Sequence, residues 1–140
     1  MYLKVMDTFT PEQRSRIMSA VRQKNTKPEM AVRRLLHAMG YRCRLHAAEL
    51  PGKPDIVFRR RRKALFVHGC FWHGHDCPKG NRPASRKEYW DAKIDRNVAR
   101  DLDRIERLRA DDWEVLVIWE CETLKRKAEA LSDRLRSFLG

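Results

Sequence analysis

Two short apolar strands separated by one long amphipathic helix constrain the fold of this chain most. Residues 64–68 and 114–119 are apolar runs of strand length, and the nearly all-apolar run at 114–119 predicts a strand buried in the centre of a sheet. Between them, residues 86–110 carry apolar side chains at helical spacing: Ile94, Val98, Leu102, Ile105 and Leu108. Because strand–helix–strand crossovers are right-handed, the two strands are predicted to be parallel, with their C-terminal ends on the same side of the sheet.

Helix start signals place the other helices. "TPEQ" at 10–13 predicts a helix to about Val21, and "TKPE" at 26–29 predicts a second helix that stops at Gly40. "SRKE" at 85–88 is a capping box for the long helix, and a last helix is expected over 123–138. The result is a mixed α/β fold in a single domain spanning residues 1–140.

A hairpin brings an acid to the end of one of these strands. Short strands are expected near 41–45 and at 55–59, and the second pairs with 64–68 through a basic turn centred near Arg61 and Arg62. This register sets Asp55 opposite Val67 or His68. A carboxylate and an imidazole are therefore expected at one sheet edge.

The charge of the chain points to an anionic partner. It contains 31 Lys and Arg against 19 Asp and Glu, for a formal net charge of +12. DNA, RNA and an anionic membrane surface all fit this charge. The alternative is a soluble basic protein without an anionic partner. No apolar run has the length of a membrane span and no secretory signal opens the chain, so a cytoplasmic protein with reduced cysteines is expected.

The loop "HGCFWHGHDC" at 68–77 concentrates metal-ligand chemistry. Cys70 and Cys121 each follow the end of one parallel strand by two residues, so the two thiols are expected to meet. With Cys77 and one of His73 or His75, they form the soft tetrahedral set typical of structural zinc. Spacing does not decide between the histidines, and ordinary buried thiols beside a solvated histidine are the alternative.

A zinc ion with four protein ligands has no open position for water, so the reaction is sought elsewhere. The candidates are Asp55, His68 and the remaining loop histidine. Cys43 has no comparable partner and is expected to be a buried residue.

Several ordered motifs resemble one nuclease family. "RSRIMSAV", "NTKPE", "LPGKPDIVF", "VHGCFWHGHDC", "EYWDAKIDRNVARD" and "VIWEC" together are similar to the very-short-patch-repair (Vsr) DNA mismatch endonucleases, over about residues 14–121. The resemblance implies the fold of type II restriction endonucleases, a mixed central sheet flanked by helices. It also implies a magnesium-dependent nick on the 5′ side of a thymine mispaired with guanine, a mismatch that arises when 5-methylcytosine deaminates.

The resemblance assigns roles to the catalytic candidates. It implies that Asp55 binds magnesium together with the main-chain carbonyl of Val67. It places His68 and His73 at the positions of catalytic histidines, and Asp101 at the position of the aspartate that orients His73. Val67 departs from the threonine of the best-known members, but any residue supplies a carbonyl.

Further roles follow from the same resemblance. Glu29 is similar to another active-site acid, although it also fits a helix-capping position, and these two interpretations are evenly balanced. The implied zinc ligands are Cys70, His75, Cys77 and Cys121.

Aromatic residues of the loop are candidates for DNA contact. Phe71 and Trp72 match family residues that wedge into DNA beside the mismatch, and Asn97 is a further expected DNA contact. Trp90 matches a third wedge, although its spacing from Ile94 alone favours the core. Trp113 and Trp119 are expected in the core.

The sequence thus predicts a monomeric mismatch endonuclease acting on double-stranded DNA in the bacterial cytoplasm, at the nucleoid. Contacts with mismatch-repair proteins are a further expectation from the resemblance, and no membrane contact is expected. Two rivals remain: a restriction-type or general repair nuclease of the same fold, and a mismatch-binding module without catalysis. Asp55, His68 and His73 together argue against the second.

Overall fold

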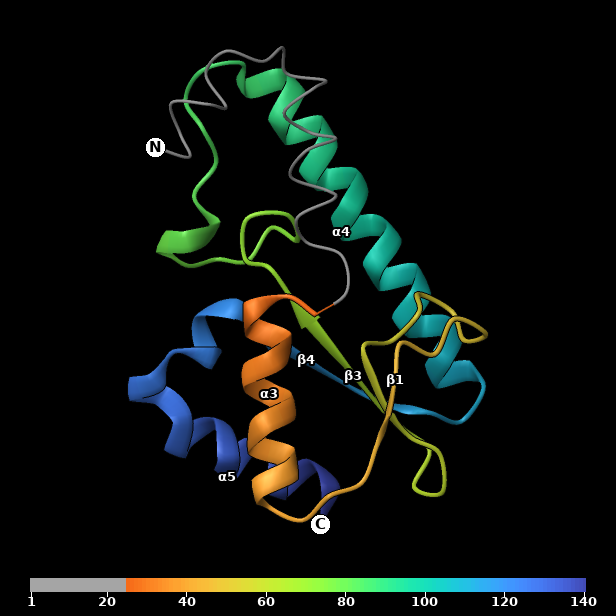
Figure 1. Ribbon diagram of the computed structural model, residues 1–140. Coiled ribbons are helices and arrows are strands. Elements are labelled where there is room, and N and C mark those ends of the chain that lie inside the picture. Colours follow the sequence, from red (N-terminus) through yellow and green to blue (C-terminus); the bar gives the residue numbers. More distant parts are fainter. Residues whose placement is uncertain (1–24) are drawn as a thin grey trace.

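A mixed four-stranded sheet lies between two helical layers in the computed structural model, which describes residues 25–140 (Figure 1). Helices α3 (Lys27–Ala38) and α5 (Ala128–Leu139) cover one face, and α4 (Lys87–Ala110) covers the other. The helix expected from Thr10 to Val21 lies outside the described residues. Within residues 25–140, no helix is both long enough and apolar enough to cross a membrane.

The strand order is β1 (Arg44–Leu45), β2 (Ile56–Phe58), β3 (Lys63–His68) and β4 (Glu114–Trp119). β1, β2 and β3 pair antiparallel, whereas β3 and β4 pair parallel, with Val67 opposite Ile118 and His68 opposite Trp119. The predicted parallel crossover is therefore confirmed. The predicted central position of β4 is wrong: it is the edge strand of the described sheet, and only Ile118 in it is buried.

The hairpin register differs from the prediction by one step. Ile56 lies opposite Leu65, so the register continues to place Asp55 opposite Phe66 and not opposite Val67 or His68. The turn closes earlier than expected because the Arg62 N–H donates to the carbonyl of Arg59 at 3.1 Å, with Arg62 in the left-handed region at φ 52°.

Two cores lie on opposite faces of the sheet, as the alternation of strand side chains requires. The core under α3 and α5 consists of Val32, Leu36, Ile56, Phe58, Leu65, Ile118, Leu131, Leu135 and Leu139. The core under α4 consists of Ala47, Val57, Ala64, Phe66, Ile105, Leu108 and Trp113. Cys43, expected to be buried, is only partly buried at the margin of the first core.

Helix boundaries show which local signals operate. Thr26 caps α3 as predicted, because its hydroxyl accepts the Glu29 N–H at 3.3 Å. The predicted capping box at Ser85 is wrong: the residue before α4 is Arg86, in the left-handed region, with no side-chain cap. Two short 3₁₀ turns, Glu120–Thr123 and Lys125–Lys127, precede α5, which therefore begins later than predicted. Leu102, expected on the apolar stripe, is 57% exposed.

Candidate active site and metal cluster

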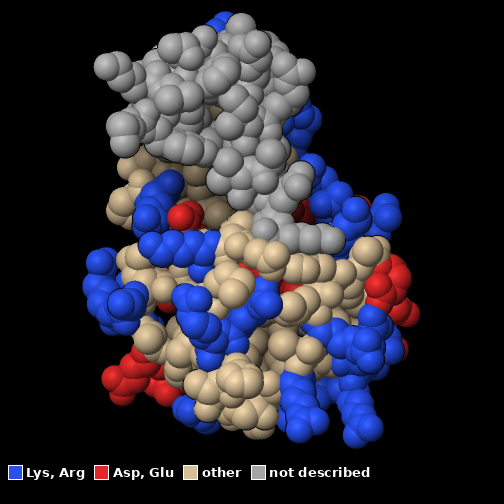
Figure 2. All heavy atoms as spheres, in the orientation of Figure 1, with Lys and Arg blue, Asp and Glu red and all other residues tan. Residues whose placement is uncertain are grey.

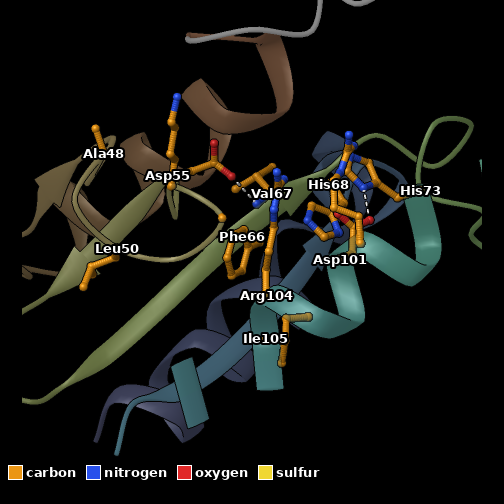
Figure 3. A pocket seen from close by; sticks show the side chains of 13 residues that line it. Ala48, Leu50, Asp55, Phe66, Val67, His68, His73, Asp101, Arg104 and Ile105 are labelled. Carbon is orange, nitrogen blue, oxygen red and sulfur yellow. Dashed lines mark hydrogen bonds and ion pairs between the residues drawn. The ribbon is translucent and has the colours of Figure 1, made fainter. Parts of the chain in front are cut away.

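A cavity of about 650 Å³ lies between α4 and the C-terminal end of β3 (Figure 3). Its walls bring together most of the candidate catalytic residues, which come from four different segments. They are Asp55 before β2, Val67 and His68 on β3, His73 in the following loop and Asp101 on α4. Three cationic side chains also line it: Lys53, Arg100 and Arg104. A negatively charged ligand would thus meet both acids and cations here.

Two imidazoles form a stacked pair in this cavity. The rings of His68 and His73 lie 3.8 Å apart between centroids and are nearly parallel, at 4°. Nδ1 of His73 hydrogen-bonds the carboxylate of Asp101. Although burial opposes ionisation of Asp101, the hydrogen bond and charge of His73 lower the pKa of this carboxyl. Asp101 therefore stays ionised and fixes the orientation of His73, as an orienting acid beside a general base does.

Asp55 stands at the other wall of the cavity. Its carboxylate accepts the Val67 N–H at 2.7 Å, which explains how a residue opposite Phe66 still reaches Val67. Burial, together with the negative charge of Glu29, raises the pKa of Asp55 to about 6, against the lowering effect of the Val67 N–H. A cation bound beside Asp55 would favour the ionised form of this carboxyl and so lower its pKa.

Glu29 is almost fully buried, with a side-chain exposure of 2%. One carboxylate oxygen contacts Nε2 of His46 at 2.8 Å and lies 3.4 Å from a guanidinium nitrogen of Arg33. The Glu29 N–H is also capped by Thr26, so Glu29 lies at the predicted helix-capping position, and its role as an active-site acid stays a prediction. Glu29 does not line the cavity, but its charge acts on Asp55.

Sequence reasoning missed His46. It adopts a left-handed backbone at φ 51°, its N–H donates to the Asp55 carbonyl at 2.9 Å, and its ring pairs with Glu29. The residue thus links Glu29 to the segment that carries Asp55. No local motif marks it, because its partners are distant in sequence.

The four predicted zinc-ligand residues meet in a second cluster. Ligand atoms of Cys70, His75, Cys77 and Cys121 all lie within 4.8 Å of one another. Parallel pairing of β3 with β4 delivers Cys70 and Cys121, as predicted, and His75, not His73, is the histidine beside them. Three sulfurs and one imidazole nitrogen match the donor set of structural zinc, so the cluster can hold a metal ion.

Backbone geometry and thiol chemistry both support this cluster. A side chain at Gly80 would meet the His75 carbonyl oxygen at 1.9 Å, so only glycine lets the loop close here. Burial raises the pKa of Cys70 to about 12. Burial also disfavours ionisation of Cys77, but hydrogen bonds from Cys70, Gly80 and Lys79 lower the pKa of its thiol overall. Metal binding at this site must therefore displace a proton from at least Cys70.

Among the described residues, a second group that could hold a metal ion consists of His68, His73 and Asp101, and it differs from the first in its donor atoms. Two of its members already bond each other through His73 Nδ1 and Asp101. Imidazole-rich sets suit transition metals, whereas magnesium prefers oxygen ligands. The hydrogen-bonded pair accounts for this group without an ion.

The loop aromatics pack into one cluster. Phe71, Trp72 and Trp90 contact one another with centroid distances of 5.1, 5.4 and 5.9 Å. Trp72 and Trp90 are 4% and 7% exposed, while Phe71 is half-buried. Phe71 and Trp72 also line a separate hollow of about 480 Å³. Buried Asn97 donates its side-chain N–H to the Trp72 carbonyl at 3.0 Å, so it supports the loop in this structure.

The two remaining tryptophans differ from each other. Trp113 is buried in the core under α4, as expected. Trp119 is half-buried and stacks on His75, with centroids 4.1 Å apart, so it lies against the metal cluster and not in the core.

An acid, a paired imidazole and cationic side chains in one cavity of a basic protein have the chemistry of a nuclease centre. Comparison with known proteins agrees. The family model described as DNA mismatch endonuclease Vsr matches residues 6–79. The type II nicking enzyme V.XorIIP of Xanthomonas oryzae is 54% identical over 133 residues, covering 95% of this chain and 96% of that protein.

Two further relatives are similar over most of their length. The type II nicking enzyme V.NmeAIP of Neisseria meningitidis is 43% identical over 122 residues, covering 87% of this chain and 86% of that protein. The DNA mismatch endonuclease Vsr of Escherichia coli is 40% identical over 136 residues, covering 95% and 87%. This chain belongs to the Vsr family of DNA mismatch endonucleases.

Proposed function

We propose that this protein nicks double-stranded DNA on the 5′ side of the thymine in a T:G mismatch, in a magnesium-dependent reaction. The observation that carries the proposal is the convergence of Asp55, His68, His73 and Asp101 on one cavity at the end of β3. The expected fold of type II restriction endonucleases agrees with the mixed sheet and with a site at the ends of its strands.

The acid–imidazole pair supplies the proton chemistry. Asp101 holds His73 Nδ1 and so orients the imidazole, whose other ring nitrogen would accept a proton from the attacking water. His68 stacks on the same ring and restricts its position. This arrangement resembles the orienting of a general base by a neighbouring, partly buried acid.

Asp55 and the Val67 carbonyl would hold the magnesium ion. Glu29 would add negative charge near that ion and hold His46, whose N–H donates to the Asp55 carbonyl. Magnesium bound by these residues would polarise the phosphate and neutralise charge that develops on it. Zinc would be held by Cys70, His75, Cys77 and Cys121 and would brace the loop between His68 and Cys77.

The aromatic cluster is the proposed mismatch reader. Phe71 faces the hollow with Trp72, and Trp90 backs both rings. Inserting such rings between base pairs costs least where pairing is already weak, which favours a mismatch. Asn97 would act by fixing Trp72 in place.

A panel of nicking assays tests the function. Duplexes with T:G, other mismatches or matched pairs, each with randomised flanking bases, are incubated with zinc-loaded protein with and without magnesium. We expect a single nick, only beside T:G and only with magnesium, and no nick by Asp55→Asn despite retained binding. Equal cleavage of matched DNA on both strands would instead support a restriction-type nuclease, and tight mismatch binding without any nick would support a binding module.

A further inference from the structure

Arg104 carries a cationic group into the candidate active site that no role above uses. It lies on α4, three residues after Asp101, and lines the cavity together with Asp55 and His68. Figure 3 shows its side chain running from α4 alongside Phe66 toward Val67. The side chain of Arg104 therefore lies in the cavity that holds the catalytic candidates.

The stem of Arg104 is held in place by packing. A side chain at Gly52 would come within 3.1 Å of Arg104 Cβ and Cδ and of the Phe66 ring, so glycine at this position makes room for the arginine. Gly52 adopts φ 76°, a conformation that favours glycine for a second reason. The aliphatic part of Arg104 is thus confined between a turn and a core ring.

The guanidinium head, by contrast, has no hydrogen-bond or ion-pair partner among residues 25–140. Both nearby carboxylates are already engaged, Asp55 with the Val67 N–H and Asp101 with His73. Arg100, on the same wall, donates to the Asn97 side chain at 3.1 Å. A guanidinium without a partner among the described residues, in a cavity open to solvent, is suited to an external anion with two oxygens to offer.

We propose that Arg104 binds a non-bridging oxygen of the scissile phosphate and stabilises the charge that accumulates there during hydrolysis. The inference rests on the proposed function. In that reaction a water oxygen bonds to phosphorus and one phosphorus–oxygen ester bond breaks, leaving a phosphate monoester and a hydroxyl. A guanidinium that is already fixed in position stabilises the more highly charged transition state better than water does, because it does not have to reorient.

The test replaces the head of Arg104 and retains its stem. Arg104→Met keeps the packing on Gly52 and Phe66, Arg104→Lys keeps the charge, and Arg107→Met on the solvent side of α4 is the matched control. Arg107 is 69% exposed and pairs with Asp103. Single-turnover nicking, duplex affinity and thermal stability are measured for all four proteins.

We expect Arg104→Met to slow nicking about 100-fold while binding and melting temperature change little, and Arg104→Lys to recover about tenfold. Sulfur placed at each non-bridging oxygen of the scissile phosphate should slow the wild type more than Arg104→Met for one of the two diastereomers. Nicking by Arg104→Met within about threefold of the wild type, or an equal loss in Arg107→Met, overturns the assignment. If the wild type nicks no T:G duplex, the proposed function itself is wrong and the inference falls with it.

Discussion

Asp55 shows how a buried carboxylate affects the folding free energy. Burial and the charge of Glu29 raise its pKa to about 6, whereas the unfolded chain has the ordinary value near 3.8. Between those two pH values the folded protein binds more protons than the unfolded one, so stability falls as pH rises through this window. Above about pH 6 the full free-energy cost of ionising Asp55 in the folded protein is present.

Replacement of this carboxylate should therefore stabilise the protein. Asp55→Asn is expected to raise the free energy of unfolding by roughly 1–3 kcal/mol at pH 7.5, and the gain should shrink toward zero near pH 4. Urea unfolding across this pH range, without added magnesium and without chelator, measures the difference. Exposed Asp133→Asn serves as the control, since surface pairs contribute little. A pH-independent difference would show that ionisation of Asp55 is not its source.

Residue types and motifs identified the acids and imidazoles of the cavity, but not most of its other lining residues. Asp55, His68, His73 and Asp101 do meet, because strand ends and one helix face place them. His46 could not be predicted, since its pairing with Glu29 depends on a left-handed backbone and a tertiary contact. The burial of Trp72 likewise depends on α4, which supplies both Trp90 and Asn97.

At the scale of elements, the parallel pairing of β3 with β4 builds both clusters. His68 ends β3, and Cys70 and Cys121 follow the two strand ends by equal steps. This result followed from the sequence because the crossover rule depends only on element order. Register and caps were less predictable: the turn at 59–62 closed one step early, and Arg86 replaced a side-chain cap at α4.

Loss of one thiol should release the metal and loosen these strand ends. Cys121→Ser is expected to lose bound zinc and to melt at a lower temperature, because metal binding contributes directly to folding. The fall in zinc affinity should exceed the roughly 10–100-fold typical of losing an outer partner. Metal analysis and thermal unfolding provide the measurement, with Cys43→Ser as a control outside the cluster. Unchanged zinc content in Cys121→Ser would refute the four-ligand site.

At the scale of the whole molecule, we expect positive charge and the aromatic cluster to have separate roles in the proposed function. Lys and Arg side chains spread across the face seen in Figure 2, in keeping with the net charge of +12. Such a surface attracts the phosphate backbone of any duplex regardless of sequence. If the protein discriminates mismatched from matched DNA as proposed, we expect that discrimination to come from a local feature such as the aromatic loop.

Binding experiments can separate these tasks. Phe71→Ala and Trp72→Ala should reduce the preference for T:G over matched duplex by about tenfold, or roughly 1.4 kcal/mol, and leave the salt dependence of affinity unchanged. Phe71 is the cleaner site, because removal of buried Trp72 also leaves a cavity. Exposed Leu102→Ala is the apolar control. If these substitutions altered the salt dependence of affinity but left the preference for T:G intact, the proposed separation of roles would be wrong.

The loop at 68–77 also limits where the chain can accept insertions and deletions. Only Gly69 separates His68 from Cys70, so an insertion there would disturb both the candidate active site and the Cys/His cluster that could hold a metal ion. The turn at 59–62 lies at the opposite end of β3, so a change in its length need not move His68 or Cys70. Variation in length, and the attachment of tags or fusion partners, should therefore be tolerated at that turn and rejected in the loop.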